Sequence, residues 1–252
     1  MHYDINWLTT KVEQGENLKF IYFWGHTNKL SAVAGNFCFS QWYEAPFYVD
    51  GKLYRTSEHW MMAQKALLFN DKATFDEILV AEKPAVAKEL GRRVMGFDEI
   101  VWNEKRFEIV KTGNVHKFNQ NPAFADYLIK TGNAVLVEAS PVDIIWGIGL
   151  SKDSKDINNI YGWRGLNLLG FVLMEVRDFL RDFGSFMSIE DSMQTPWAKF
   201  PQANYNDMFW KMGEGENYIL QFSNYYDTLS EKQQIIYKLT NPAPHSWDGF
   251  YS

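Results

Sequence analysis

The stretch YRTSEHWMMAQKALLF, residues 54–69, predicts a helix that is apolar around almost its whole circumference. Thr56 or Ser57 can cap its beginning, because a hydroxyl at that position accepts a hydrogen bond from a backbone N–H of the first turn. A helix of this composition tends to be buried, yet this one carries Glu58 and Lys65. A charged group in an apolar surround needs a partner or a chemical task.

Glu58 and Lys65 are seven residues apart, which returns them to nearly the same direction around a helix, about 10 Å apart along its axis. We therefore expect both side chains to line one cleft. On an arbitrary helix two solvent-exposed charges would explain the pair better, but the apolar neighbours favour the cleft here. His59 is explained at least as well by a core histidine bonded to a backbone carbonyl, and we leave it out of the candidate site.

The pattern on either side of this helix predicts a small β component and mostly helices. Asp50-Gly51 between apolar flanks indicates a hairpin over residues 47–54. Gly91 is expected to end the helix that starts at Pro84, and Gly113 weakens the prediction of a helix around it. The pattern predicts strands at 18–24, 36–42 and 134–139, and helices at 84–90, 103–118, 122–130 and 166–183.

Composition restricts the broad class of the protein. The 252 residues carry a net charge of -6 with acids and bases interspersed, so strong unspecific binding of nucleic acid is not expected. Cys38 is the only cysteine, which excludes an intramolecular disulfide and a cysteine-based zinc cluster and favours a buried apolar role. We find no secretory signal, and the longest apolar stretch is too short to cross a membrane. A cytoplasmic protein without membrane contact is expected.

The C-terminal part differs from the rest. Residues 184–196 form a plausible linker, and the tail to residue 252 is rich in aromatic side chains. It contains one clear helix, SEKQQIIYKL, in which Ser230 and Gln233 fit a capping box. We expect this extension to pack on the preceding domain or to contact a partner.

A second group of candidate residues lies in LVEASPVDIIWGIGL, residues 136–150. Glu138 and Asp143 follow the predicted strand, Trp146 offers a ring for stacking, and Gly147 and Gly149 let a ligand approach the backbone closely. A tight loop whose acids cap neighbouring turns explains the same residues without a ligand. The stretch fails as a dinucleotide fingerprint, since no third glycine opens a helix in the right register.

Arginines beside glycines could bind a phosphate. Trp163-Arg164-Gly165 precedes a predicted helix, where free backbone amides and a guanidinium can hold an anion. Arg92 and Arg93 follow Gly91 in a similar way. Each pair, taken alone, is more often a surface charge than an anion site.

These pieces, in this order, resemble the NADAR family, which is also known through the YbiA-type N-glycosidases that act on riboflavin intermediates. The resemblance covers roughly residues 18–182. This chain has Ser40-Gln41-Trp42 where relatives commonly show Ser-Asn-Phe, which affects the front of the expected pocket. The matching residues are Phe23, Ser40, Pro46-Phe47, Gly51, TSEHWMMAQKA at 56–66, Gly91-Arg92, Trp102, Lys117-Phe118, residues 136–150 and GLNLLGFVLMEVR at 165–177.

The resemblance implies an α+β fold, mostly helical with a small β component, in a single catalytic domain at 18–183. Residues 1–17 would form an N-terminal extension and 184–252 the aromatic-rich C-terminal extension. It also implies hydrolysis of the N-glycosidic bond between ribose and a nitrogenous partner. Family substrates are phosphoribosyl-aminopyrimidines from riboflavin synthesis and guanine bases of DNA or RNA that carry ADP-ribose. Some members work as antitoxins beside ADP-ribosyltransferase toxins.

The expected catalytic residues are Glu58, Lys65 and Asp143. Lys65 could form a Schiff base with the sugar while Glu58 moves protons, or Glu58 and Asp143 could act as a glycosidase-like carboxylate pair. Neither route needs a metal or another cofactor. The alternative function is a module that binds ADP-ribose without cleaving it. The residues expected to contact substrate are Trp24, Ser40, Arg92, Trp102, Trp146, Gly147, Gly149 and Asn167.

Overall fold

The computed structural model describes residues 2–28 and 32–251, which form two compact units. Unit 1 comprises the described chain up to Tyr48 together with Leu53–Ser185. Unit 2 comprises Val49–Lys52 and the chain from Phe186 onward. The boundary after Ser185 falls within the predicted linker at 184–196. The packing of the C-terminal extension on the catalytic domain stays a prediction.

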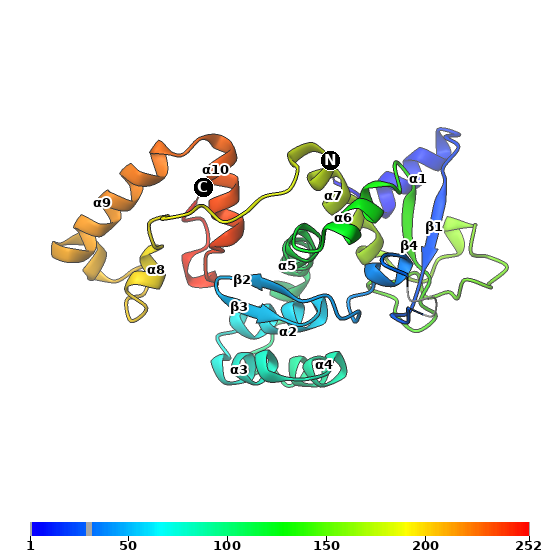
Figure 1. Ribbon diagram of the computed structural model, residues 1–252. Coiled ribbons are helices and arrows are strands. Elements are labelled where there is room, and N and C mark those ends of the chain that lie inside the picture. The colour runs from blue at the N-terminus through cyan, green and yellow to red at the C-terminus, as the bar shows by residue number, and fades with distance from the viewer. Residues whose placement is uncertain (1, 29–31, 252) are drawn as a thin grey trace. The chain divides into compact units, whose positions relative to one another are not determined.

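Unit 1 is mostly helical, and the described chain has two small sheets, which confirms the predicted α+β class (Figure 1). One of these sheets is a hairpin whose residues Val49–Lys52 are assigned to unit 2. Strand β1 pairs with β4 in parallel, with Phe20 opposite Val135 and Phe23 opposite Glu138. The hairpin pairs β2 with β3. The helices are α1 (Ile5–Glu13), α2 (Ser57–Leu68), α3 (Lys72–Val80), α4 (Pro84–Arg92), α5 (Glu99–Asn119), α6 (Pro122–Ile129) and α7 (Leu168–Phe183), and the strands are β1 (Phe20–Phe23), β2 (Phe47–Val49), β3 (Lys52–Tyr54) and β4 (Val135–Glu138).

Helix α2 is a central element of unit 1, packed against α3, α4 and α5. Thr56 caps it by accepting a hydrogen bond from the His59 N–H. The His59 ring lies 3.0 Å from the Ala81 carbonyl oxygen and 2.8 Å from the Thr56 hydroxyl, and burial lowers its pKa. His59 is therefore a core histidine with both ring nitrogens occupied, in agreement with its exclusion from the candidate site.

Two glycines allow the neighbouring helices to approach α2 closely. Helix α4 does not end before Gly91 as predicted but continues to Arg92, because Gly91 serves packing. A Cβ at Gly91 would lie 2.0 Å from the Met62 sulfur, and one at Gly113 in α5 would lie 2.2 Å from the Trp60 indole. A glycine inside a helix lowers its intrinsic stability, but here it permits contacts that no larger residue allows.

The predicted strand at 36–42 is wrong. Residues Asn36–Phe39 form a 3₁₀ helix, η1, and the chain then turns. The aromatic side chains that suggested a strand belong to the core: the Phe39 ring is buried, with its centroid 5.3 Å from that of Phe23. The Asn36 amide donates to the Tyr22 carbonyl, and Lys117 donates to the Ser40 carbonyl. These side chains satisfy backbone groups that a strand would have paired.

The turn between β2 and β3 confirms the predicted hairpin. Asp50 and Gly51 have φ angles of 49° and 69°, the left-handed values that a two-residue turn of this type requires. Aspartate tolerates this conformation better than most side chains, and glycine adopts it without strain.

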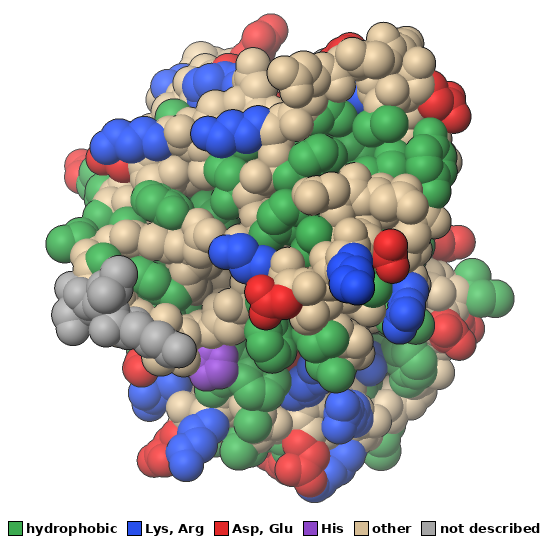
Figure 2. All heavy atoms as spheres, turned by 90° about the vertical axis from the view of Figure 1, so that its right-hand side faces the viewer, with side chains coloured by type: hydrophobic (Ala, Val, Ile, Leu, Met, Phe, Trp, Pro, Cys, Tyr) green, Lys and Arg blue, Asp and Glu red, His purple; other side chains and the backbone are tan. Residues whose placement is uncertain are grey.

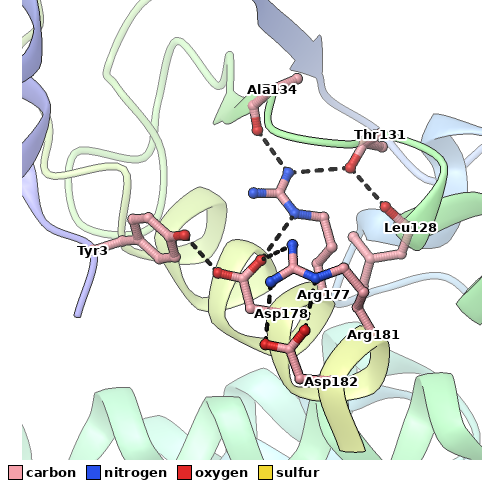
Figure 3. A network of polar contacts seen from close by, with 8 residues as sticks. All are labelled: Tyr3, Leu128, Thr131, Ala134, Arg177, Asp178, Arg181 and Asp182. Carbon is pink, nitrogen blue, oxygen red and sulfur yellow. Dashed lines mark hydrogen bonds and ion pairs between the residues drawn. The ribbon is translucent and has the colours of Figure 1, made fainter. Parts of the chain in front are cut away.

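A polar network fixes α7 in unit 1 (Figure 3). The Arg177 side chain is only 2% exposed, and it donates to the Ala134 carbonyl at 2.7 Å and to the Thr131 hydroxyl at 3.2 Å. Asp178 accepts a hydrogen bond from the Tyr3 hydroxyl and forms an ion pair with Arg177. The network joins the start of the described chain and the turn before β4 to α7. The segment with α1 thus belongs to unit 1, although no helix was predicted there.

Unit 2 contains an aromatic cluster, as expected for the C-terminal extension. Tyr237 on α10 is fully buried. The ring centroids of Phe222, Tyr226 and Tyr251 lie within 6.3 Å of the Tyr237 ring centroid. The Ser230 capping box is present. Helix α9 was not predicted. The elements of this unit are α8 (Pro196–Lys199), η3 (Met208–Lys211), α9 (Gly213–Thr228), α10 (Glu231–Thr240) and η4 (His245–Trp247).

None of the helices among residues 2–28 and 32–251 combines the length and apolar character needed to cross a membrane. Figure 2 shows acidic and basic side chains interspersed on one face of the molecule, without a large field of either sign.

Candidate active site

Unit 1 contains a cavity of about 250 Å³ beside α2. Its wall combines three carboxyl groups, two lysine amines and three indole rings with apolar side chains. Such a mixture suits a planar polar ligand, because rings stack on its faces while charged groups meet its edges. The lining residues are Ser40, Gln41, Trp42, Glu58, Met61, Met62, Lys65, Lys88, Trp102, Glu138, Asp143, Ile145, Trp146 and Leu169.

Glu58 lies in the first turn of α2 and is only 2% exposed. Its backbone N–H donates to the Gln41 carbonyl at 3.0 Å, and its carboxyl Oε1 is buried without a hydrogen-bond partner among the described residues. Burial raises its pKa to about 7, against the opposing effects of the Lys88 charge and of a hydrogen bond with the Trp42 side chain. Glu58 can therefore both hold and release a proton near neutral pH.

Lys65 lies in the last turn of α2 and lines the same cavity as Glu58, as the seven-residue spacing predicted. Its Nζ donates to the Gly91 carbonyl at 2.8 Å and lies 4.0 Å from the centroid of the Phe97 ring and 5.7 Å from that of Trp102. Burial lowers its pKa. This shift favours the neutral amine, which is the nucleophilic form.

Asp143 lies in the loop after β4 and also lines the cavity. Its Oδ1 accepts hydrogen bonds from the backbone N–H groups of Ile145 at 2.9 Å and of Trp146 at 2.7 Å. Both interpretations of the sequence therefore apply: Asp143 caps the turn of its loop, and it also lines the cavity. By fixing this turn, Asp143 holds the Trp146 ring at the wall.

Two charged wall residues were not among the expected catalytic or substrate-contacting residues: the sequence singled out Glu138 without giving it a role, and it did not indicate Lys88. Glu138 ends β4, and its carboxyl Oε2 is buried without a partner among the described residues. Burial raises its pKa to about 8, and the nearby charges of Asp143 and Glu58 add to this, against Lys88. The Lys88 amine, from α4, lies 5.6 Å from the centroid of the Trp42 ring. Lys88 precedes Arg92 by four residues, a spacing that places both on one helix face and could have indicated it.

Three of the predicted substrate-contacting residues line the cavity and two others lie outside its lining. Ser40, Trp102 and Trp146 belong to the wall. Trp24 is 61% exposed, and Arg92 is exposed at the end of α4. The Arg92 charge nevertheless acts on Glu58, since it lowers the pKa of that carboxyl. Substrate contacts by Trp24 and Arg92 stay predictions.

The other three predicted residues support the wall from behind. Asn167 is fully buried, with its Oδ1 accepting from the Glu138 N–H and its Nδ2 donating to the Leu136 carbonyl, both at 2.9 Å. A Cβ at Gly147 would lie 2.9 Å from the Glu138 carbonyl oxygen, and Gly149 has a φ of 69°. These residues therefore shape the end of β4 and its loop, and direct contact with substrate stays a prediction for them.

Comparison with known proteins places this geometry in a family. The NADAR domain model matches residues 22–181. "N-glycosidase R617" of Acanthamoeba polyphaga mimivirus is 44% identical over 65% of this chain and 97% of its own length. "N-glycosidase YbiA" of Escherichia coli (strain K12) is 33% identical over 56% of this chain and 80% of its own. The "Riboflavin biosynthesis protein VVA0006" of Vibrio vulnificus is 30% identical over 64% of this chain and 41% of its own.

The fold is similar to that of a solved relative. The NMR structure of E. coli YbiA superimposes with a TM-score of 0.52 and 26% sequence identity, over 70% of this chain and 94% of the other. The match to the family model covers more than half of the chain and includes every residue of the cavity wall. The chain therefore belongs to the NADAR family.

Proposed function

We propose that the protein is an N-glycosidase that hydrolyses the bond between ribose C1 and an amine nitrogen carried by a heterocyclic ring. The observation that carries the proposal is the pairing of Glu58 and Lys65 on one cavity wall, each with a pKa shifted toward its neutral form. A site that only holds its ligand does not need such a pair. Relatives named N-glycosidases share this region of the chain.

We infer that the substrate is a ribosylated aminopyrimidine or guanine. Trp102 and Trp146 offer faces for a planar base, and the carboxyl groups of the wall can accept hydrogen bonds from amino groups or from ribose hydroxyls. Two substrates contain the same ribose–nitrogen bond: a phosphoribosyl-aminopyrimidine, and guanine of DNA or RNA that carries ADP-ribose. In the second case the protein would reverse ADP-ribosylation and act beside an ADP-ribosyltransferase toxin.

In the first proposed route, Lys65 forms a Schiff base. The nitrogen lone pair opens the ribose ring to an imine, the neutral Lys65 amine adds to C1, and the ring amine leaves with a proton. Water then adds to the lysine imine and releases the sugar as an aldehyde, which restores Lys65. The Gly91 carbonyl and the Phe97 ring hold the Lys65 amine in place between turnovers.

The second route needs no covalent intermediate. One carboxyl group protonates the departing nitrogen while a second carboxylate removes a proton from the attacking water, as in glycosidases. Glu58 and Asp143 are the pair that the sequence suggests. Lys65 would then serve as a cation beside the substrate.

Borohydride reduction during turnover distinguishes the two routes. The Schiff-base route predicts a covalent sugar adduct on Lys65, absent in Lys65→Ala and present in Lys72→Ala, which removes an exposed lysine paired with Asp76. Near-normal turnover by Lys65→Ala would rule out this route. Both substrates should be assayed side by side, because the same experiment separates the repair function from the metabolic one.

The binding-module alternative is tested with the same materials. Incubation with DNA that carries ADP-ribosylated guanine should release free ADP-ribose. A stable complex without released sugar, for this DNA and for the phosphoribosyl-aminopyrimidine alike, would contradict the hydrolase and favour a reader of ADP-ribose.

A further inference from the structure

Glu58 and Glu138 line the same cavity from different structural elements, α2 and the end of β4. Each has one carboxyl oxygen that is buried without a hydrogen-bond partner among the described residues, Oε1 of Glu58 and Oε2 of Glu138. A buried unpaired polar atom costs free energy, and in a cavity a ligand or a water molecule can complete it. The cavity therefore presents two carboxyl groups to its occupant.

The charged groups around the two carboxyls differ. Glu58 faces the cations Lys88 and Arg92 and accepts a hydrogen bond from Trp42, while the acids Asp143 and Glu138 oppose its ionisation. Glu138 faces two acids, Asp143 and Glu58, and one cation, Lys88. Lys65 also lines the cavity, but its amine is held at the Gly91 carbonyl. If the two carboxyls share one proton, the surroundings place it on Glu138 and leave Glu58 ionised.

The backbone of Glu138 is held on both sides, which fixes where its side chain points. Its N–H donates to Asn167 Oδ1 at 2.9 Å, and its carbonyl accepts from the Ile148 N–H at 3.0 Å. Its Cα is also in register with Phe23 of β1. A group that must meet a reacting atom needs such support, because small displacements cost large factors in rate.

We propose that Glu138 is the general acid of this site: it donates its proton to the departing amine nitrogen, while Glu58 accepts a proton from water. This inference rests on the proposed N-glycosidase function. In one turnover the C1–N bond breaks, the nitrogen takes the Glu138 proton, and the water oxygen bonds to C1 as its proton passes to Glu58. Transfer of that proton from Glu58 to Glu138 restores the starting state. The same donor and acceptor serve when Lys65 carries the sugar.

The first test varies the leaving group. N-ribosyl anilines bearing a 5-phosphate and increasingly electron-poor rings need less and less protonation to depart. With the parent amine, Glu138→Gln should lose about 10²-fold or more in kcat, and this loss should shrink steadily along the series. Glu58→Gln should lose a similar factor that stays constant. A constant loss for Glu138→Gln, or a rise in KM with unchanged kcat, would overturn the assignment and make Glu138 a binding group.

The second test does not depend on turnover. In the free protein at about pH 7.5, the infrared carbonyl band of a protonated carboxyl group should be present in the unmodified chain and in Glu58→Gln, and absent in Glu138→Gln. A band lost in Glu58→Gln instead would place the proton on the other carboxyl and overturn the proposal. If the protein hydrolyses none of the ribosyl amines, the proposed function fails, whereas the infrared result still decides where the proton resides.

Discussion

The two walls of the cavity are built by different physical means. On α2 the directions of Glu58 and Lys65 follow from helical periodicity, since seven residues complete nearly two turns. On the other wall, Glu138 and Asp143 line the cavity because the backbone there is set by a hydrogen bond from the Glu138 N–H to Asn167 and by one from the Ile145 N–H to Asp143. The direction of side chains on a helix wall thus follows from their spacing alone, whereas a loop wall depends on residues distant in the sequence.

The largest effect is expected on the helix wall. Replacing Glu58 by Gln or Lys65 by Ala should lower kcat by about 10²- to 10⁴-fold, because each change removes a proton-transfer group or the nucleophile. Thermal unfolding should change little in Glu58→Gln, which keeps the shape of the buried side chain. Steady-state kinetics and calorimetry of the same preparations check both statements. Activity within a few fold of the unmodified chain would remove α2 from the catalytic site.

The wall formed by Glu138 and Asp143 should depend on Asn167, although Asn167 does not line the cavity. Asn167→Ala removes the partners of the Glu138 N–H and of the Leu136 carbonyl, which should cost about 2–4 kcal/mol of unfolding free energy. It should also lower kcat by about 10-fold or more by displacing Glu138. Denaturant unfolding and kinetics measure the two effects. A variant with normal stability and normal kcat would show that this wall does not depend on Asn167.

The contacts behind α2 can be tested through the two glycines. Gly113→Ala should destabilise the protein by about 1–3 kcal/mol, because its Cβ would meet the rigid Trp60 ring at 2.2 Å. Gly91→Ala should cost less, since the Met62 side chain that it meets is flexible. Denaturant unfolding of both variants gives the comparison. Equal costs would mean that the stiffness of the neighbour does not decide the result.

The smallest expected effect is a dependence of stability on pH. Glu58 and Glu138 have pKa values raised in the folded chain to about 7 and about 8, so between pH 4.5 and 8 the folded state binds more protons than the unfolded state. The unfolding free energy should therefore fall as pH rises through this range. Glu138→Gln should reduce the total fall in unfolding free energy between pH 4.5 and 8 by on the order of 2 kcal/mol. Unfolding curves at several pH values measure the slope, and an unchanged slope would contradict the raised pKa of Glu138.

The parts of the fold that the sequence predicted depend on local signals. Helix α2, the Asp50-Gly51 turn and the Ser230 capping box are each determined by residues close together in the chain. The placement of Glu58 and Lys65 on one cavity wall followed from the same local geometry.

The parts that escaped prediction depend on contacts between distant residues. The strand predicted at 36–42 failed because aromatic side chains that pack in a core resemble those of a strand. Gly91 was taken as a helix end because its contact with Met62 is invisible in the sequence. The raised pKa of Glu138 could not be anticipated either, since it arises from burial and from acids on two other elements.

The partner of the Lys65 amine is a main-chain oxygen, the Gly91 carbonyl, in the last turn of α4. No replacement of a side chain can delete that acceptor, so the availability of this amine is governed by the distance between two helices. Substitutions that shift α4 relative to α2 should thus change the reactivity of the Lys65 amine without altering any group that contacts the substrate.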